Sequence, residues 1–186
     1  MNARERVMRA FAFEKTDRIA RYDIFLPEFA QNWRREKQLP DANLYDYYPN
    51  IDIGTVLADQ DGPLLSSAEL LEEKGGRRLV RDGWGRVVEQ KENAYFEVEV
   101  SSVLEEKGTL DSLVFDDPAQ EERYLGLARH ARRNAPRFAP VSGVLGLYMG
   151  SFRMRGQLQY LCDMVEDPEF CIALAQRLGE FIKIQG

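Results

Sequence analysis

Two aspartates follow a short apolar segment and are candidates for contact with a ligand. Asp59 and Asp61 come directly after residues 51–58, an apolar run that predicts a strand. In α/β proteins, the loops beyond the carboxyl ends of strands carry many of the binding groups. The pair therefore indicates either a ligand-holding edge or an ordinary solvated turn, and the sequence leaves both open.

A second candidate site follows the apolar residues 138–142. Ser142 ends this run, and a glycine-rich stretch containing Tyr148 extends over residues 143–150. The next residues, about 152–161, have a helical pattern that places Leu158 and Leu161 on the apolar face. Strand, glycine-rich loop and helix form one unit of an α/β fold. The loop predicts part of a small-molecule site, or only a turn of the chain.

Other side chains that could take part in catalysis are poorly placed for it. His130 is the only histidine and lies among arginines, which favours a solvated surface position over a general base. Cys162 and Cys171 are nine positions apart, without the spacing of a metal site, and we expect both to be small buried residues. No Gly-x-x-x-x-Gly-Lys-Ser/Thr sequence indicates a nucleoside triphosphate site.

Composition narrows the class of protein. The formal net charge of −6 gives no sign of a nucleic-acid surface. No apolar run approaches the ~20 residues of a membrane span. The first residues lead into a charged amphipathic helix rather than the apolar core of a signal peptide. We expect a cytoplasmic protein of one domain, or part of a larger one, without nucleic-acid or membrane partners.

The first half of the chain predicts alternating helices and strands. Asn2 is a candidate N-cap, with Glu5 at the capping-box position. A strand is expected over residues 19–25, where charged residues on a mostly apolar strand mark either its end or a functional position. A helix should begin at Pro27 and a short one near residues 43–48, before the strand at 51–58.

The second half contains a different pattern. Residues 77–100 alternate with turn signals and predict an antiparallel ribbon, whose buried face would carry Phe96, Val98 and Val100. Helices should begin at Asp117-Pro118 and at Asp167-Pro168-Glu169. The apolar face of the last helix comprises Phe170, Leu174, Leu178, Phe181 and Ile182, and we expect it to require a neighbouring element.

Several short sequence motifs, taken in their order along the chain, resemble those of a known protein family. The opening Arg4-Glu5-Arg6-Val7, followed by Asp17-Arg18-Ile19, then Asp82-Gly83-Trp84-Gly85, residues 140–156 and Asp167-Pro168-Glu169 occur in a specific order. Together they resemble the uroporphyrinogen decarboxylase superfamily, which includes the decarboxylase and the corrinoid-dependent methyltransferases. The resemblance extends over essentially the whole chain, and the Asp82–Gly85 turn is similar to that of the methyltransferase-like branch.

The resemblance implies a fold and a site. The fold would be α/β, a partial TIM (β/α)8 barrel interrupted by the ribbon at 77–100, with the strand-end acids and glycine loop at its top. Asp59 would be the catalytic residue, matching the aspartate that contacts pyrrole nitrogens in the decarboxylase. The implied substrate contacts are Tyr22, Asp23, Asp61, Ser142 and Tyr148.

Departures from the family pattern bear on the activity. The arginine-containing loop of the decarboxylase is missing before Leu26-Pro27-Glu28-Phe29, where residues 21–25 stand instead. Its active-site tyrosine falls near Met154, which has no hydroxyl. These differences favour a corrinoid-dependent methyltransferase. The alternatives are a decarboxylase-type lyase of tetrapyrrole biosynthesis and a non-catalytic truncated barrel that acts as a binding module.

The resemblance also implies what the chain would need. We expect no cofactor to be bound by this chain alone, whereas corrinoid and zinc are implied for a complete methyltransferase. Its zinc ligands, one histidine and two cysteines, belong to a second half that is not in this chain. Three predicted parallel strands cannot close a barrel of eight, so we expect an inactive portion that requires a C-terminal half or a second copy. The implied ligand is a small molecule or a tetrapyrrole.

Overall fold

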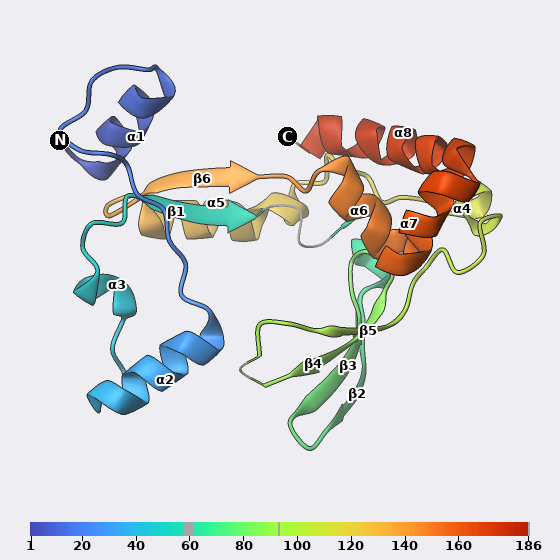
Figure 1. Cartoon of the computed structure of the whole chain (residues 1–186), viewed down its shortest axis with the longest axis horizontal. Coiled ribbons are helices and arrows are strands. Elements are labelled where there is room, and N and C mark those ends of the chain that lie inside the picture. The colour runs from blue at the N-terminus through green and yellow to red at the C-terminus, as the bar shows by residue number, and fades with distance from the viewer. Residues whose placement is uncertain (58–61, 93, 186) are drawn as a thin grey trace. The chain divides into compact units, whose positions relative to one another are not determined.

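The computed structural model describes residues 1–57, 62–92 and 94–185 (Figure 1). Over these residues the chain is a mixed α/β protein with eight α-helices, a two-stranded sheet and a four-stranded sheet. It divides into two compact units, the first formed from residues 1–57, 93–95 and 124–142 and the second from the remainder. No closed barrel forms in the described part of the chain, where no helix is long and apolar enough to cross a membrane.

The first unit contains the parallel sheet. Strands β1 (Ile53–Leu57) and β6 (Ala139–Gly143) pair and run in the same direction (Figure 1). Tyr22 forms an isolated parallel bridge with Ile53. The parallel direction is as expected, but the strand expected over residues 19–25 is reduced to that one bridge. Ile19 is 83% exposed, so this segment buries too little apolar surface to extend the ladder.

Local sequence signals account for three helices of the first unit. Helix α1 (Ala3–Phe11) is capped by Asn2, whose side-chain oxygen accepts a hydrogen bond of 2.8 Å from the amide of Glu5. Helix α2 (Pro27–Lys37) begins at its proline, and α3 (Leu44–Tyr47) follows Asn43 as its cap. All three agree with the sequence-based expectations.

Helix α5 (Glu122–Asn134) begins later than expected. The expected start at Asp117-Pro118 is wrong, because the Asp117 side chain accepts a hydrogen bond of 2.8 Å from the amide of Ala119 and closes a local turn. The Asp117 carbonyl in turn accepts a bond of 3.2 Å from Arg123 Nε. The Asp117 side chain is therefore engaged in this turn and does not cap α5, which begins five residues later.

Asp52 connects α1 to the amino ends of all three parallel segments. Its side chain is almost completely buried and accepts hydrogen bonds from Arg6 Nη1 at 2.5 Å, from Arg18 at 2.6 and 2.8 Å, and from the Arg21 amide at 3.0 Å. Its own amide donates to the Arg21 carbonyl at 2.8 Å, and its carbonyl accepts from the Ala139 amide at 2.7 Å. A buried carboxylate requires such full compensation.

Asp17 completes this ion-pair network. It accepts bonds from Arg6 Nε at 2.6 Å and Arg6 Nη2 at 2.8 Å. The hydrogen bonds from Arg6 hold the pKa of Asp17 well below its ordinary value, and Asp17 raises the pKa of Arg6. Burial opposes ionisation of Asp52, but the bonds from Arg18, Arg21 and Arg6 prevail and lower its pKa. Both carboxylates are therefore charged at neutral pH.

The second unit combines an antiparallel sheet with a helical layer. The sheet has the order β2 (Glu69–Lys74), β3 (Arg77–Arg81), β4 (Val87–Lys91) and β5 (Val98–Ser101). The helical elements are a 3-10 turn η1 (Leu65–Ser67) and helices α4 (Thr109–Ser112), α6 (Leu147–Arg155), α7 (Gln157–Glu166) and α8 (Pro168–Gln185).

The antiparallel ribbon is confirmed between residues 77 and 101, but it has one more strand than the sequence indicated. The extra strand is β2, which is exposed along its length. The expected buried face is wrong: Phe96, Val98 and Val100 are 78%, 58% and 60% exposed, whereas Val88 on β4 is fully buried. Since β5 is an edge strand, its alternation does not determine which face meets the core.

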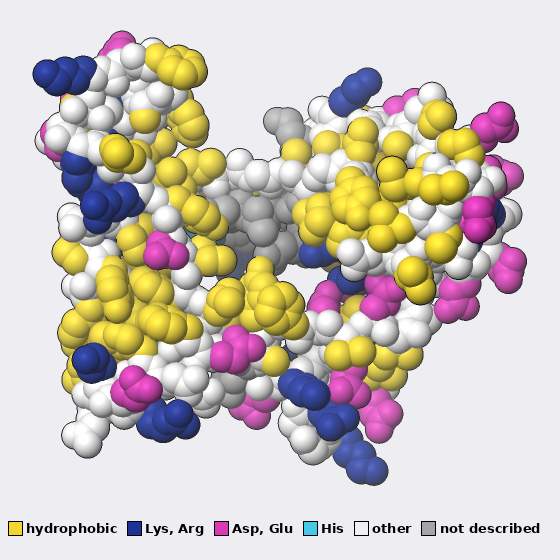
Figure 2. All heavy atoms as spheres, viewed as in Figure 1, with side chains coloured by type: hydrophobic (Ala, Val, Ile, Leu, Met, Phe, Trp, Pro, Cys, Tyr) yellow, Lys and Arg dark blue, Asp and Glu magenta, His cyan; other side chains and the backbone are white. Residues whose placement is uncertain are grey.

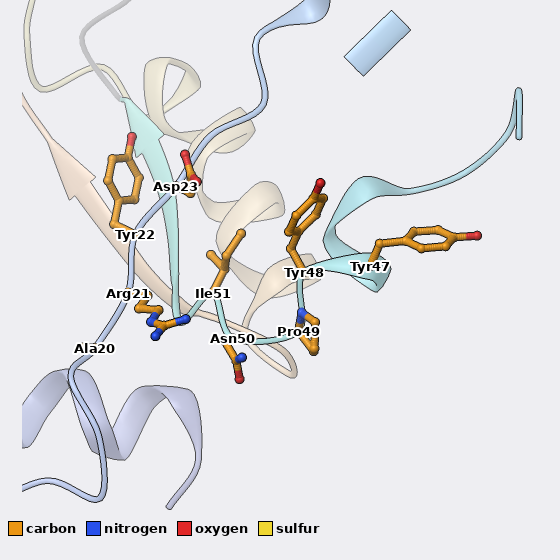
Figure 3. Close-up of a pocket in the computed structure, with 9 residues that line it drawn as sticks. All are labelled: Ala20, Arg21, Tyr22, Asp23, Tyr47, Tyr48, Pro49, Asn50 and Ile51. Carbon is orange, nitrogen blue, oxygen red and sulfur yellow. The ribbon is translucent and has the colours of Figure 1, made fainter. Parts of the chain in front are cut away.

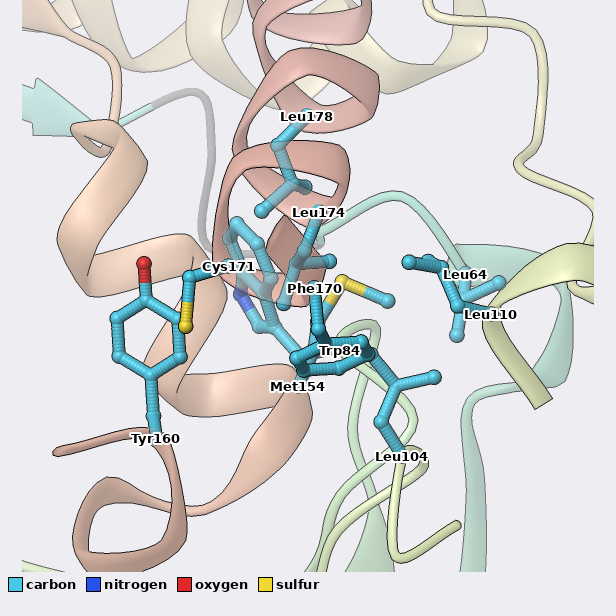
Figure 4. Packing of buried hydrophobic residues seen from close by; sticks show 10 residues of the cluster. All are labelled: Leu64, Trp84, Leu104, Leu110, Met154, Tyr160, Phe170, Cys171, Leu174 and Leu178. Carbon is cyan, nitrogen blue, oxygen red and sulfur yellow. The ribbon is translucent and has the colours of Figure 1, made fainter. Parts of the chain in front are cut away.

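The turn at Asp82–Gly85 inserts Trp84 into the core of the second unit. Asp82 Oδ1 accepts bonds from the amides of Trp84 at 2.9 Å and Arg86 at 3.1 Å. Gly85 has φ of +76°, and a Cβ there would lie 2.8 Å from atoms of Leu64 and Val103. The buried Trp84 ring packs among residues from α6 and α8 (Figure 4), namely Met154, Phe170, Cys171, Leu174 and Leu178.

Helix α8 confirms the second Asp-Pro signal. The Asp167 side chain accepts a bond of 3.2 Å from the Phe170 amide, and the helix begins at Pro168. Phe170, Leu174, Leu178 and Phe181 are buried, and Ile182 packs against the same core. The expected neighbouring elements are present and belong to the same unit, where α6 and α7 pack against α8.

The glycine-rich stretch differs from the expected loop. Residues 147–150 already belong to α6, and Gly156 at φ of +86° separates α6 from α7. A Cβ at Gly150 would lie 3.0 Å from the Trp84 ring, so that glycine permits close packing rather than a turn. The expected apolar face is also wrong, since Leu158 and Leu161 are 77% and 45% exposed.

We predict that Asp52→Asn lowers the free energy of unfolding by about 3–5 kcal/mol, because it leaves Arg6 and Arg18 buried or half-buried beside a neutral amide. Urea denaturation measures the loss. Asp46→Asn is the matched control: its ion pair with Arg137 is exposed and should contribute less than about 1 kcal/mol. Equal losses in the two variants would contradict the central role of Asp52.

We also predict that this stability difference depends on pH. The pKa of Asp52 is lower in the folded protein than in the unfolded chain, where it is near 3.8. Ionised Asp52 therefore stabilises the fold at pH values above about 3.8. This contribution is lost as the pH falls through the pKa of the folded state. The difference between the natural chain and Asp52→Asn should be constant above about pH 5 and should shrink below about pH 4. Denaturation series at fixed ionic strength test this, and a difference that grows on acidification would refute it.

Candidate functional site

A pocket of about 500 Å³ in the first unit brings together two of the predicted ligand contacts, Tyr22 and Asp23 (Figure 3). Its volume is within the range of small-molecule sites. The walls come from the segment around the isolated bridge and from the loop that leads into β1. Among the described residues, the lining comprises Ala20, Arg21, Tyr22, Asp23, Tyr47, Tyr48, Pro49, Asn50 and Ile51.

The Asp52 network positions one wall of this pocket. The Arg21 backbone is held at both its amide and its carbonyl by Asp52, and Tyr22 is held by its bridge to Ile53. Asp23 follows directly, and its side chain accepts a bond of 2.9 Å from the Ile24 amide. Because residues 47–51 precede β1, the pocket borders the amino end of this strand.

An aromatic cluster supports the other wall. The Phe25 ring lies 4.9 Å from Tyr45 and 5.1 Å from Tyr48, measured between ring centroids. Tyr45 also meets Phe138 edge to face at 5.3 Å. Such tilted and edge-to-face pairs fix ring orientation as well as burying area. Tyr48 is therefore held from behind and keeps 40% of its surface exposed.

The pocket combines flat apolar surfaces with groups of both charges. In Figure 3 the side chains of Tyr22, Asp23 and Tyr48 extend in a common direction, and Tyr47 extends away from them. Asp23 offers a carboxylate acceptor and Asn50 an amide. The Arg21 guanidinium, which can bind a carboxylate in a bidentate manner, forms no ion pair within the described part of the chain. This set suits a planar ligand whose edge carries both donors and carboxylates or amides.

Burial raises the pKa of Tyr45, and the neighbouring Tyr22 and Asp23 raise it further. Negative charge from Asp23 opposes formation of a phenolate beside it. Tyr22 and Asp23 therefore lie close enough to Tyr45 to influence its ionisation.

The remaining predicted site residues are not brought into this pocket. Ser142 is exposed on β6 in the same unit. Tyr148 is 44% exposed on α6 in the second unit, with its ring 5.6 Å from Phe152 and 5.9 Å from Tyr160. Asp59 and Asp61 lie outside the described residues.

Sequence reasoning missed the residues that form the second wall. Tyr47, Tyr48 and Asn50 were expected only as the end of a short helix and a connection. Their signal was available: an aromatic run before a buried strand, closed by Pro49, is unusual for a solvated loop. The sequence predicts Arg21 only as a charged residue on an apolar strand, because its position in the pocket depends on contact with the distant Asp52.

The described residues do not supply a zinc site. Over residues 1–57, 62–92 and 94–185, no group of three or more metal-ligating side chains comes together. His130 is exposed on α5, and Cys162 is exposed on α7, against the expectation that both cysteines are buried. Cys171 is buried, and burial raises the pKa of its thiol, as do Asp163 and Asp167. A raised thiol pKa disfavours the thiolate that binds a metal.

Comparisons with protein-family models, with curated proteins and with solved structures returned no match. The family resemblance therefore remains an inference from the order of the sequence motifs.

We predict that Tyr45 ionises at a higher pH than an exposed tyrosine, and that Asp23→Asn moves its pKa downward by removing a nearby negative charge. Carbon NMR of ring-labelled tyrosine, followed through an alkaline titration, measures both values. Asp46→Asn removes an acid next to Tyr45 in sequence but outside the pocket lining, and should leave the Tyr45 pKa nearly unchanged. A larger shift in the control than in Asp23→Asn would contradict the geometry.

Proposed function

We propose that this chain forms the N-terminal part of a uroporphyrinogen decarboxylase-type partial TIM barrel, that it contributes a tetrapyrrole-binding surface, and that the complete enzyme is a corrinoid-dependent methyltransferase. The observation that carries the proposal is the arrangement of the parallel segments. The Tyr22 segment, β1 and β6 are neighbours in the order in which they occur in the chain. Sequential parallel neighbours with helical connections are how a (β/α)8 barrel is built.

The inserted ribbon supports the same proposal. Strands β2–β5 occur between β1 and β6 in sequence and form a separate antiparallel sheet. The turn at Asp82–Gly85, which resembles that of the methyltransferase-like branch, places Trp84 in the core of the second unit. Each of these residue types has a structural role in the turn. Asp82 accepts the amide hydrogen bonds, Trp84 anchors the turn in the core, and Gly85 adopts a positive φ.

The lining of the pocket contains three kinds of group that bind tetrapyrroles, but they lie at the amino end of β1 and not at the carboxyl end, where the resemblance implies the site. Tyr22 and Tyr48 offer ring surfaces, Asp23 can accept hydrogen bonds from pyrrole or amide N–H groups, and Arg21 can bind a peripheral carboxylate. When bound, a corrinoid would supply the transferable methyl group. The role proposed for this chain is to bind and orient that group and to shield one of its faces from water.

Two observations favour the methyltransferase over the decarboxylase. Met154, at the position that resembles the decarboxylase's active-site tyrosine, is fully buried in the core around Trp84 and has no hydroxyl to offer. The segment that replaces the arginine-containing loop presents one arginine, Arg21, to the pocket. Loss of a charged partner for a substrate carboxylate costs on the order of 2–5 kcal/mol.

We predict that the chain binds hydroxocobalamin or uroporphyrin with a change in the visible absorbance of the tetrapyrrole. Asp23→Asn and Asp59→Asn should each weaken binding by roughly tenfold or more, the loss of one charge-assisted hydrogen bond of about 1.5–3 kcal/mol. Asp111→Asn, an exposed acid on α4, is the matched control and should bind as the natural chain does. Melting temperatures should stay within a few degrees.

The outcomes separate the three functions. Preference for the corrinoid supports the methyltransferase type, whereas appearance of coproporphyrinogen from uroporphyrinogen would identify a decarboxylase. An unchanged absorbance with both tetrapyrroles would contradict the proposal and favour the non-catalytic alternative.

A further inference from the structure

Helix α1 buries one part of its apolar surface and exposes the rest. Val7 is 3% exposed, whereas Met8 and Phe11 on the same helix are 60% and 65% exposed. Figure 2 shows hydrophobic side chains gathered at the surface in this region of the first unit. Large apolar side chains at adjacent exposed positions of one short helix indicate a contact surface rather than a solvated face.

These side chains form one wall of a pocket of about 440 Å³ beside the beginning of β6. The opposite wall is also apolar and comes from the end of the α5 connection and from β6. Its volume lies in the range of small-molecule sites. The described residues that line it are Arg4, Val7, Met8, Phe11, Ala135, Ala139, Pro140 and Val141.

The chemistry of the lining selects an aliphatic occupant. Seven of the eight lining side chains are hydrocarbon or thioether, and Pro140 has no amide N–H to donate. Water inside such a pocket would find few hydrogen-bond partners, so its replacement by a hydrocarbon chain is favourable.

Arg4 adds a charge that the structure does not compensate. The other arginines of α1 are paired: Arg6 lies 2.6 Å from Asp17, and Arg9 lies 3.2 Å from Glu5. Arg4 forms no ion pair or side-chain hydrogen bond with any described residue. A free guanidinium on an otherwise apolar lining is complementary to the carboxylate of an amphiphile.

We propose that this pocket binds a medium-chain aliphatic carboxylate, with the chain between α1 and β6 and the carboxylate on Arg4. The site is separate in its residues from the Tyr22–Asp23 pocket and does not depend on the function proposed for that pocket.

Calorimetric titration of the full chain with octanoate, decanoate and decanol tests the proposal. Each added methylene should strengthen carboxylate binding by about fourfold, as expected for burial of a CH₂ group. Decanol should bind more weakly than decanoate. Arg4→Gln should weaken decanoate roughly tenfold and leave decanol unchanged, while Arg9→Gln, on the same helix but outside the lining, should leave both unchanged.

Ala135→Phe tests the cavity itself. Ala135 is exposed at the rim, so a phenyl group there should fill the pocket and abolish decanoate binding while the melting temperature is retained. Equal affinity for decanol and decanoate, or binding that survives both Arg4→Gln and Ala135→Phe, would overturn the assignment. Self-association of the natural chain that Ala135→Phe removes would show that a second copy occupies the groove, and would overturn it equally.

Discussion

The first unit depends on one buried carboxylate. Asp52 accepts bonds from two arginine side chains and one amide, and its backbone joins the Tyr22 segment to β1 and β6. Burial of an ionised group with so little exposed surface is costly unless its partners are present, so removal of one partner strongly destabilises the unit. Arg6 belongs to α1, so Asp52 fixes the helix that lines the pocket between α1 and β6. Arg21 lines the Tyr22–Asp23 pocket, so Asp52 also fixes one wall of that pocket. Two candidate ligand sites with different chemistry thus share one electrostatic support.

Much of the local structure could be predicted from sequence because its causes are local. The Asn2 cap, the start of α2 at Pro27 and the Asp167-Pro168 start of α8 depend on residues within one helical turn. The failures have causes elsewhere in the fold. Asp117 had the same Asp-Pro signal as Asp167, yet its side chain closes a turn whose carbonyl binds Arg123. Gly150 looked like a loop residue, but it is helical and admits the Trp84 ring, a contact that no local pattern contains.

The candidate site was predictable to a similar degree. A charged residue on an apolar segment drew attention to Asp23, and its neighbour Tyr22 lines the same pocket. The role of Asp52 was not visible, since its arginine partners are distant in sequence and only the fold brings them together. The Tyr47–Asn50 wall has a local signal in its aromatic run, but the same run also fits a connection between a helix and a strand, so the sequence alone does not predict a wall. The described structure establishes a mixed α/β chain with one parallel pair and a separate antiparallel sheet. The partial barrel is a proposal that rests on the order of the sequence motifs.

The interleaving of the two units has a consequence for how the molecule reaches its native state. The first unit is assembled from the beginning of the chain and from residues 124–142, so β1 has no β6 to pair with until the whole ribbon, α4 and α5 have been made. Pairing of β1 with β6 closes a long loop and gives this sheet a high contact order, which slows folding. Until then β1 presents an unpaired edge, the kind of surface that joins to other chains. The ribbon is built from neighbouring strands and can fold early, which shortens the effective loop. Its stability can therefore set the rate at which the distant parallel sheet forms, although it contributes no strand to it.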